Sequence, residues 1–188
     1  MPPLPPPEER PLRAAGARRP ATGQPTTAAL VATLRTIAQE TPNLVAVFDA
    51  RAIAGERHLL SAWAHLGRSR ARGERRLRDR SAELALYVAG DDQLPRALKK
   101  VGVTDDTEAI VVVAERPLDP AELVPRFGLV PDPAAYPRPV DADLLERLGI
   151  GATERGAVPT AAWEGLVLER VALVDLTAPA VRAAPERN

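Results

Sequence analysis

The pattern of hydrophobic positions is clearest in the middle of the chain. Residues 84–88 (LALYV) and 109–114 (AIVVVA) are short apolar runs bounded by turn residues, which is typical of strands. Neither run alternates with polar residues, so we expect both strands to be covered on two faces. Between them, a turn over residues 89–92 leads into a helix over residues 93–100, which Gly102 should end in a left-handed conformation.

The same kind of pattern predicts three elements before this core. Apolar side chains recur at helical spacing up to Glu40, and Thr26 or Thr27 can cap the start of that helix. Residues 44–48 (LVAVF) are five apolar positions in a row, which predicts a strand. Residues 56–68 again show one apolar stripe and predict a second helix.

Prolines interrupt the chain every few residues after the central strands, so the helices there must be short. We expect helices over residues 120–127 and 141–148, followed by a longer helix over residues 161–170. Residues 171–176 (VALVDL) predict a last strand, and a continuation of the preceding helix is the alternative.

The length of 188 residues suits one domain, and the composition predicts where it lies. Residues 1–25 contain eight prolines and little to bury, which predicts a disordered or extended Pro-rich tail. We therefore place a single α/β domain over residues 26–177 and a flexible C-terminus over residues 178–188.

Composition narrows the class of protein only slightly. The formal net charge is zero, with 25 basic and 25 acidic residues, and there are no cysteines for disulfide or thiol chemistry. No apolar run approaches the roughly 20 residues that span a bilayer, and no signal-peptide pattern is present. We therefore expect a cytoplasmic protein with no membrane partner. The near absence of Lys and Asn suits either a thermophile or a GC-rich genome.

The charge is concentrated in one place, the arginine link between residues 68 and 80. Seven arginines against two acidic residues give this stretch a local charge of +5. Arginine forks match phosphate geometry, so the link predicts a phosphate-binding patch. The alternative is a solvated loop whose arginines pair with acids elsewhere. The arginines are Arg68, Arg70, Arg72, Arg75, Arg76, Arg78 and Arg80.

Motifs for catalysis are missing from the sequence. There is no Gly-rich phosphate loop, no G-x-S-x-G elbow and no obvious acid–base pair. His58 and His65 are seven residues apart, too far along a helix for a typical metal pair, so we expect surface or half-buried roles for both. We predict no catalytic residue, metal or cofactor. A small-molecule binding domain or enzyme with a cleft near Gly90 and His58 stays as the alternative.

Several stretches resemble the TPRKB family of PRPK-binding proteins, the small accessory subunits of the KEOPS complex. The likeness covers about residues 44–176, is densest over residues 48–66 and 82–103, and reaches the end of the domain at residues 168–176. The matching positions are Ala52, Ile53, Gly55, His58, Leu59, Glu83, Ala85, Leu86, Tyr87, Ala89, Gly90, Asp92, Gln93, Leu94, Ala97, Leu98, Gly102 and Val103.

This resemblance implies a fold and a function. The expected fold is a single α/β domain with a mostly antiparallel central sheet flanked by helices. The expected role is a non-catalytic subunit of the machine that makes threonylcarbamoyladenosine in tRNA. Such a subunit binds the small PRPK-type kinase, helps to activate its ATPase and, in the archaeal form, holds the CCA end of tRNA. The protein would then work in a hetero-oligomer.

The resemblance also suggests where the partners bind. For tRNA we predict the arginine link together with His58, Gly90 and Gln93. Family members usually carry Arg where this chain has Asp92, and Asp91 adds a second negative charge, which should weaken RNA binding at this turn. For the kinase we predict an exposed apolar patch on the late helix. The residues of that patch are Leu166, Leu168 and Arg170.

Overall fold

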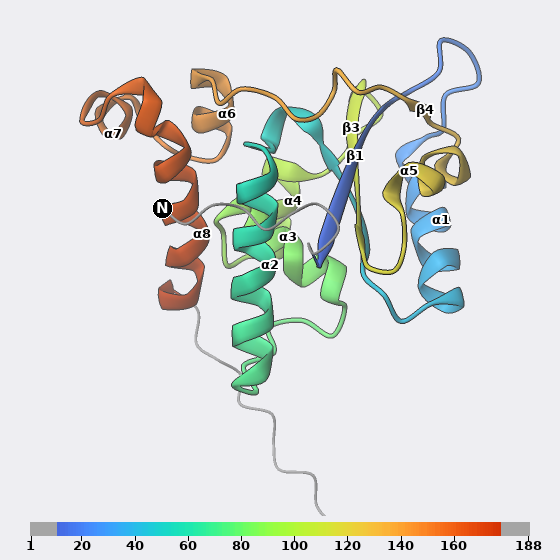
Figure 1. Ribbon diagram of the computed structural model, residues 1–188, viewed down its shortest axis with the longest axis horizontal. Coiled ribbons are helices and arrows are strands. Elements are labelled where there is room, and N and C mark those ends of the chain that lie inside the picture. Colours follow the sequence, from blue (N-terminus) through green and yellow to red (C-terminus); the bar gives the residue numbers. More distant parts are fainter. Residues whose placement is uncertain (1–10, 178–188) are drawn as a thin grey trace, which may run out of the picture.

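A four-stranded antiparallel sheet stands between two groups of helices in the computed structural model, which describes residues 11–177 (Figure 1). This confirms the predicted α/β fold with an antiparallel central sheet. The strand order is β2-β3-β1-β4, so β3 and β1 are central. The strands are β1 (Leu12–Arg18), β2 (Val45–Asp49), β3 (Ala109–Glu115) and β4 (Val130–Pro131).

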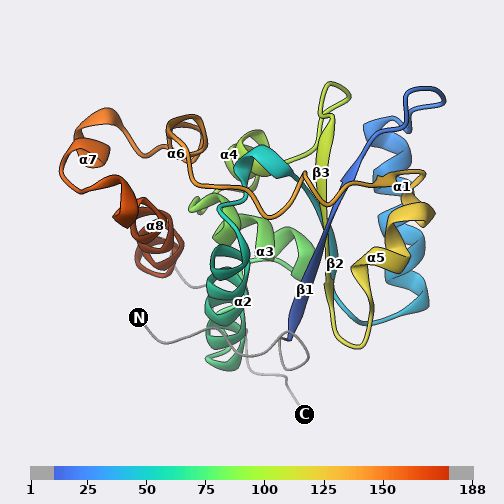
Figure 2. The same cartoon turned by 45° about the horizontal axis from the view of Figure 1, so that its top comes forward.

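Helices cover both faces of this sheet. Figure 2 shows α1 and α5 on one side of the strands and α2, α3 and α4 on the other, with α6, α7 and α8 farther out. The helices are α1 (Thr27–Glu40), α2 (Glu56–Ala71), α3 (Arg80–Ala89), α4 (Leu94–Val101), α5 (Pro120–Leu123), α6 (Ala142–Arg147), α7 (Ala152–Gly156) and α8 (Trp163–Thr177). Short 3-10 turns within the described residues are η2 (Ala50–Ala52), η3 (Val124–Phe127) and η4 (Thr160–Ala162).

Strand β3 contributes to two separate cores, one on each face of the sheet. Its side chains alternate, so Val111 and Val113 join the larger core with α2 and α3. Ile110 and Val112 join the smaller core with α1 and α5. Both faces of this strand are therefore buried, as its unbroken apolar run predicts.

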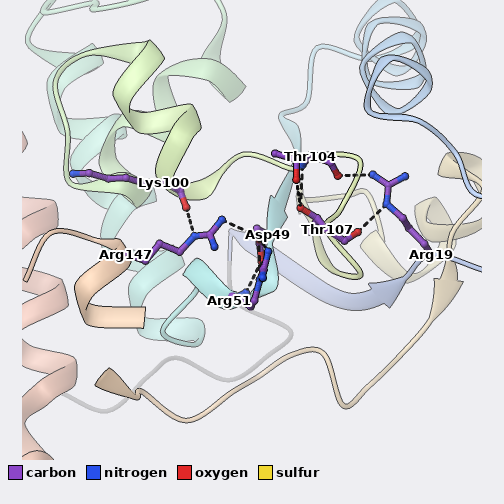
Figure 3. A network of polar contacts seen from close by, with 7 residues as sticks. All are labelled: Arg19, Asp49, Arg51, Lys100, Thr104, Thr107 and Arg147. Atoms are coloured by element: carbon purple, nitrogen blue, oxygen red, sulfur yellow. Dashed lines mark hydrogen bonds and ion pairs between the residues drawn. The ribbon is translucent and has the colours of Figure 1, made fainter. Parts of the chain in front are cut away.

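Strand β1 lies in the stretch that we expected to be a tail, so that prediction is wrong for residues 12–18. It pairs with β3 over its whole length and with β4 on its other edge. Leu12 and Ala17 are buried, and Arg19 just beyond the strand donates to the carbonyls of Thr104 and Thr107 at 2.8 Å each (Figure 3). The strand consists mainly of small residues with flanking arginines, so it does not form an apolar run in the sequence. Its stability comes from pairing with strands that are distant in the sequence. Residues 1–10 and 178–188 lie outside the described residues. The predictions of a disordered tail over residues 1–10 and of a flexible C-terminus over residues 178–188 therefore stay predictions.

Residues 84–88 form part of helix α3, so the predicted strand is wrong. The helix is capped at both ends. The Asp79 side chain accepts from the N–H of Ala82 at its start, and Gly90 follows its end in the left-handed conformation with φ 59°. Every residue from 83 to 89 is buried between neighbouring elements. A helix buried on all sides has the same unbroken apolar run as a buried strand, and the run alone cannot distinguish them.

The other predicted elements are found with small shifts. Thr26 caps α1 through the N–H of Ala29, and α8 runs on through residues 171–176, so the last strand is replaced by the helical alternative. Gly102 does end α4, but its φ of −71° is not left-handed. A glycine is needed there because a Cβ would collide with the carbonyl oxygen of Leu98.

The position of β1 can be tested with a pair of glycine substitutions. In Gly16→Ala, the new Cβ would meet the carbonyl oxygen of Asp132 and lie 2.9 Å from the N of Tyr136, so overpacking should lower the free energy of unfolding by about 1–3 kcal/mol. In Gly67→Ala, at an exposed position of α2, nothing lies within 4 Å of the new Cβ, and the gain in helix propensity should raise the free energy of unfolding by about 0.8 kcal/mol. Urea unfolding measures both, and a Gly16→Ala protein as stable as wild type would contradict this register.

Candidate functional site

The arginine link contains arginines that hold the fold together. Arg70 donates through Nε to the buried carboxylate of Glu83 at 2.7 Å, which ties the end of α2 to α3. Arg76 lies almost entirely below the surface and donates to the carbonyl of Val174 in α8 at 2.8 Å. These two side chains are therefore structural and are not available to a phosphate backbone.

Arg80 also has an internal role. Its guanidinium makes two bonds to the Glu115 carboxylate, at 2.8 and 3.0 Å, and lies 5.2 Å from the centre of the Trp63 ring. A bidentate pair with a ring contact fixes the start of α3 against the end of β3. The alternative stated for the link, in which arginines pair with acids elsewhere, therefore describes Arg70 and Arg80.

The remaining arginines of the link are exposed. Arg72 pairs with Glu74 within the same loop, at 2.8 Å. Within residues 11–177, we find no ion pair for Arg68, Arg75 or Arg78, which extend from the end of α2 and from the loop before α3. These three, the exposed link arginines, are the part of the predicted patch that can meet a phosphate group.

The turn at Gly90 joins α3 to α4 and is packed against α8. A Cβ at this position would lie 2.8 Å from the Cβ of Arg170, so the glycine is required both by its φ of 59° and by the close approach of α8. Gln93 is exposed at the start of α4. Of the predicted RNA-binding residues near this turn, only Gln93 presents its side chain to solvent.

The two acidic residues of the turn are neutralised by α4. Arg96 lies 2.8 Å from the Asp92 carboxylate and 2.9 Å from Asp91, and Lys100 lies 3.1 Å from Asp91. Burial alone would raise the pKa of Asp91, but the N–H of Gln93 and the cations of Lys100 and Arg96 hold that pKa below its ordinary value. The turn is thus less repulsive to a phosphate than its two carboxylates suggest.

His58 is fully buried beneath the start of α2 and cannot contact RNA directly. Its Nδ1 accepts from the N–H of Ala54 at 3.2 Å, and its Nε2 donates to the carbonyl of Val88 at 2.9 Å. Burial lowers the pKa of the imidazole to about 4, so the ring is neutral near pH 7. His58 in this sequence motif therefore has a structural role, because its hydrogen bond to Val88 joins α2 to α3.

His65 is half-buried, as expected, and joins three helices. Its Nδ1 lies 2.7 Å from Asp175 of α8, whose other carboxylate oxygen accepts from the Tyr87 hydroxyl at 2.9 Å. The rings of His65 and Tyr87 stack with their centres 6.1 Å apart. Burial would raise the pKa of Asp175, but the bonds from His65 and Tyr87 outweigh it and leave that pKa lowered. The arrangement holds the end of α8 against α2 and α3.

The predicted kinase-binding residues on α8 are only partly accessible. Leu166 packs against the larger core, Leu168 is half-buried, and Arg170 is held by Glu154 at 2.7 Å. The exposed apolar side chains of this helix come later, at Leu173 and Leu176, which are 42% and 80% exposed. The exposed apolar side chains of α8 therefore lie about two turns beyond the predicted patch residues.

A buried carboxylate at the end of β2 organises the opposite side of the larger core. Asp49 has no exposed side-chain surface and binds Arg51 at 2.7 Å and Arg147 at 2.8 Å. Figure 3 shows the two arginine side chains directed at this carboxylate. Burial would raise its pKa, but the two guanidinium groups and the N–H of Arg51 keep it below the ordinary value. A hollow of about 230 Å³ adjoins this network; its lining residues are Arg51, Arg138, Asp141, Asp143, Leu144 and Arg147.

A second hollow, of about 290 Å³, lies along β2 between α1 and α3. Neither of these two hollows is lined by Gly90 or His58, so neither of them supports the alternative of a ligand cleft at those residues. Among the described residues, no three His, Asp or Glu side chains are grouped to hold a metal ion. The described helices include none that is both long enough and apolar enough to span a membrane.

The strand order and the helices on both faces define a single α/β domain. A family model described as kinase binding protein CGI-121 matches residues 26–123, just over half of the chain. The chain therefore belongs to this kinase-binding family, the TPRKB family that its motifs resemble. The match runs from α1 to the end of α5 and leaves α6, α7 and α8 outside. No curated protein matches the chain.

The structural role of His58 predicts a pH effect on stability. The folded pKa of about 4 lies below the ordinary 6.5, so the folded state binds fewer protons, and stability is lost as the pH falls from 6.5 to 4. At 1.36 kcal/mol per pKa unit, the loss should be about 3 kcal/mol at pH 4. The acidic residues whose pKa is lowered add further losses in the same direction. A His58→Gln protein should keep those acidic losses but lack the contribution of His58.

Urea unfolding at pH 7 and pH 4 measures this contribution as the difference between the two proteins. His65→Gln is the matched control, because His65 is on the same helix but half-buried. Equal losses of stability in wild type and His58→Gln would show that the imidazole is not held neutral inside the fold.

Proposed function

We propose that this protein is a non-catalytic subunit of a KEOPS complex, which binds a PRPK-type kinase and tRNA while the complex makes threonylcarbamoyladenosine. The observation that carries the proposal is membership of the kinase-binding family. In this role the protein binds the small kinase, helps to switch on its ATPase and works only as part of a hetero-oligomer. The tRNA part rests on the family resemblance, which implies that the archaeal form of the subunit holds the CCA end of tRNA.

The absence of an acid–base site among residues 11–177 supports a non-catalytic role. His58 is fully buried, and His65 is bound to Asp175, so neither imidazole lies free in a hollow. The Asp49 carboxylate is occupied by Arg51 and Arg147. These titratable groups are thus engaged in contacts that hold elements together, and this includes Asp49, whose ion-pair network adjoins the hollow lined by Arg51 and Arg147.

For the tRNA, the exposed link arginines supply the phosphate contacts. Arg68, Arg75 and Arg78 project from one end of the α2–α3 pair, where no acidic side chain within the described residues neutralises them. Gln93 at the Gly90 turn is a polar group that could read an unpaired base. A short single strand bound to both sets of side chains would contact the arginines through its phosphates and Gln93 through a base.

For the kinase, the end of α8 offers one apolar contact. Leu176→Glu should weaken the complex with a purified PRPK-type kinase by about tenfold or more, because a charge would replace an apolar contact. The melting temperature should stay unchanged, since this side chain is 80% exposed. Val130→Glu, at an exposed apolar position on β4, is the matched control. Normal kinase affinity in Leu176→Glu would remove the end of α8 from the interface.

For RNA, affinity should fall as salt rises. Three phosphate contacts predict a slope of about −2 in log K against log salt, at about −0.7 for each contact with a single strand. A protein with Arg68, Arg75 and Arg78 changed to Ala should lose most of this slope and bind all RNA sequences more weakly. Fluorescence anisotropy measures the affinity and its salt slope with tRNA, and the same measurement with tRNA that lacks its CCA end isolates the contribution of that end.

A second triple variant controls for the loss of charge. Arg18, Arg35 and Arg116 are exposed but lie outside the arginine link, so their replacement by Ala removes the same charge elsewhere. If both triple variants flatten the salt slope equally, the link is only a solvated surface and does not contact RNA specifically.

A further inference from the structure

The outer edge of β2 is open. This strand pairs with β3 on one side only, and no described strand lies along its other side. The carbonyl of Leu44 accepts from the N–H of Glu115 at 2.8 Å, so Leu44 faces β3. Because the backbone direction alternates, Ala46 and Phe48 also face β3, while the N–H and C=O groups of Val45 and Val47 point outward.

These outward groups lie in a groove, which we name the β2 groove. Its volume is about 290 Å³, and its walls are α1 and α3. Its lining residues are Val31, Leu34, Arg35, Ala38, Asn43, Val45, Ala46, Val47, Phe48, Asp79, Ser81, Ala82, Ala85 and Leu98. The floor is largely buried, whereas Val31 and Leu98 on the rim are 39% and 48% exposed. The groove is therefore recessed and bordered by apolar side chains that have no cover.

An edge strand of this composition normally needs a partner. Proteins protect open edges with charges, prolines, bulges or very short strands. The other edge of this sheet follows that rule, because β4 is only two residues long and ends in Pro131. The unpaired backbone edge of β2 runs through Val45 and Val47, with neither charge nor proline before Asp49.

The shape of the groove limits what can pair with it. A second copy of this protein would have to bring its own β2, which is recessed between its own α1 and α3 in the same way. Two recessed edges cannot approach to the roughly 4.8 Å spacing of paired strands. A single extended segment can enter, add a strand through its backbone and place alternate apolar side chains against Val31 and Leu98.

The family match points to the source of this segment. Residues 26–123, which match the kinase-binding family, include every residue that lines the groove, whereas α8 lies outside the match. Arg35 on the wall of α1 is exposed and has no acidic partner among the described residues. A carboxylate on the incoming segment would complement it.

We propose that the β2 groove binds an extended segment of the kinase as an added strand. Apolar side chains of this segment pack against the rim of the groove, and an acidic side chain of the segment pairs with Arg35. This inference rests on the proposed function, because it names a contact surface for the kinase in addition to the end of α8. The added strand pairs with Val45 and Val47 and converts β2 from an edge strand into a central one.

The first test is a rim substitution. Leu98→Glu should reduce affinity for a purified PRPK-type kinase by about tenfold or more, because it places a charge where the segment is apolar. Arg35→Glu should also weaken binding, and both should retain the wild-type melting temperature. Val130→Glu and Arg18→Glu are the matched controls, because they make the same changes at exposed positions outside the groove.

The second test detects the added strand directly. Amide hydrogen exchange at Val45 and Val47 should slow at least tenfold when the kinase saturates the protein, while Ala46 and Phe48 are protected already. Kinase binding without added protection at Val45 and Val47, or with full affinity in Leu98→Glu, overturns the inference and leaves the proposed function standing. No kinase binding by the wild-type protein overturns the proposed function itself.

Two further outcomes identify a different occupant. Protection of Val45 and Val47 that appears without kinase and rises with protein concentration would mean that a second copy fills the groove. Protection in the dilute protein alone, lost when residues 1–10 or 178–188 are removed, would mean that a terminal segment of this chain fills it. Either result overturns the assignment of the groove to the kinase.

Discussion

The buried carboxylate of Asp49 is the constraint on which the arrangement of the larger core depends. A carboxylate without solvent is costly unless cations and donors surround it, and here Arg51 and Arg147 supply both. Arg147 also donates to the carbonyl of Lys100, so one charge cluster joins the end of β2, the turn η2, α4 and α6. Removal of both guanidinium groups would leave an uncompensated buried charge, at a cost of about 3–5 kcal/mol. The placement of α4 fixes both the Gly90 turn and Leu98 on the rim of the β2 groove.

Arginine serves two purposes in this chain, and the difference between them determines which surfaces can bind. Arg70 and Arg80 meet carboxylates inside the fold, as Arg147 does at Asp49. These bonds hold α2, α3 and β3 in place, so the loop between α2 and α3 projects its remaining arginines outward. A net charge of zero therefore hides a local concentration of unpaired positive charge at Arg75 and its exposed neighbours.

Local patterns in the sequence predicted the elements that depend on local causes. The Thr26 cap, the apolar run of β3 and the Pro-bounded short helices are all visible in a few neighbouring residues. Strand β1 was missed because its stability comes from pairing with residues about a hundred positions away. Helix α3 was misread because burial on every side removes the periodicity that separates helix from strand. The arginine link was found as a candidate surface, but its structural members could not be separated from its exposed ones before the partners Glu83 and Glu115 were located. His58 was misplaced for a related reason, since a motif does not state whether its residue faces solvent.

The order of the strands explains why one edge of the sheet is left for a partner. Strand β1 lies before the region that matches the family, yet it occupies the centre of the sheet and closes the far edge of β3. The short β4 then ends the sheet on that side, where Pro131 prevents further pairing. On the other side, α1 and α3 cover the two faces of β2 but do not cover its edge. Unpaired backbone groups beside apolar walls gain most from a segment that brings its own backbone, because a purely apolar ligand would leave Val45 and Val47 unpaired. The same argument favours a peptide strand over a small molecule as the natural occupant of this groove.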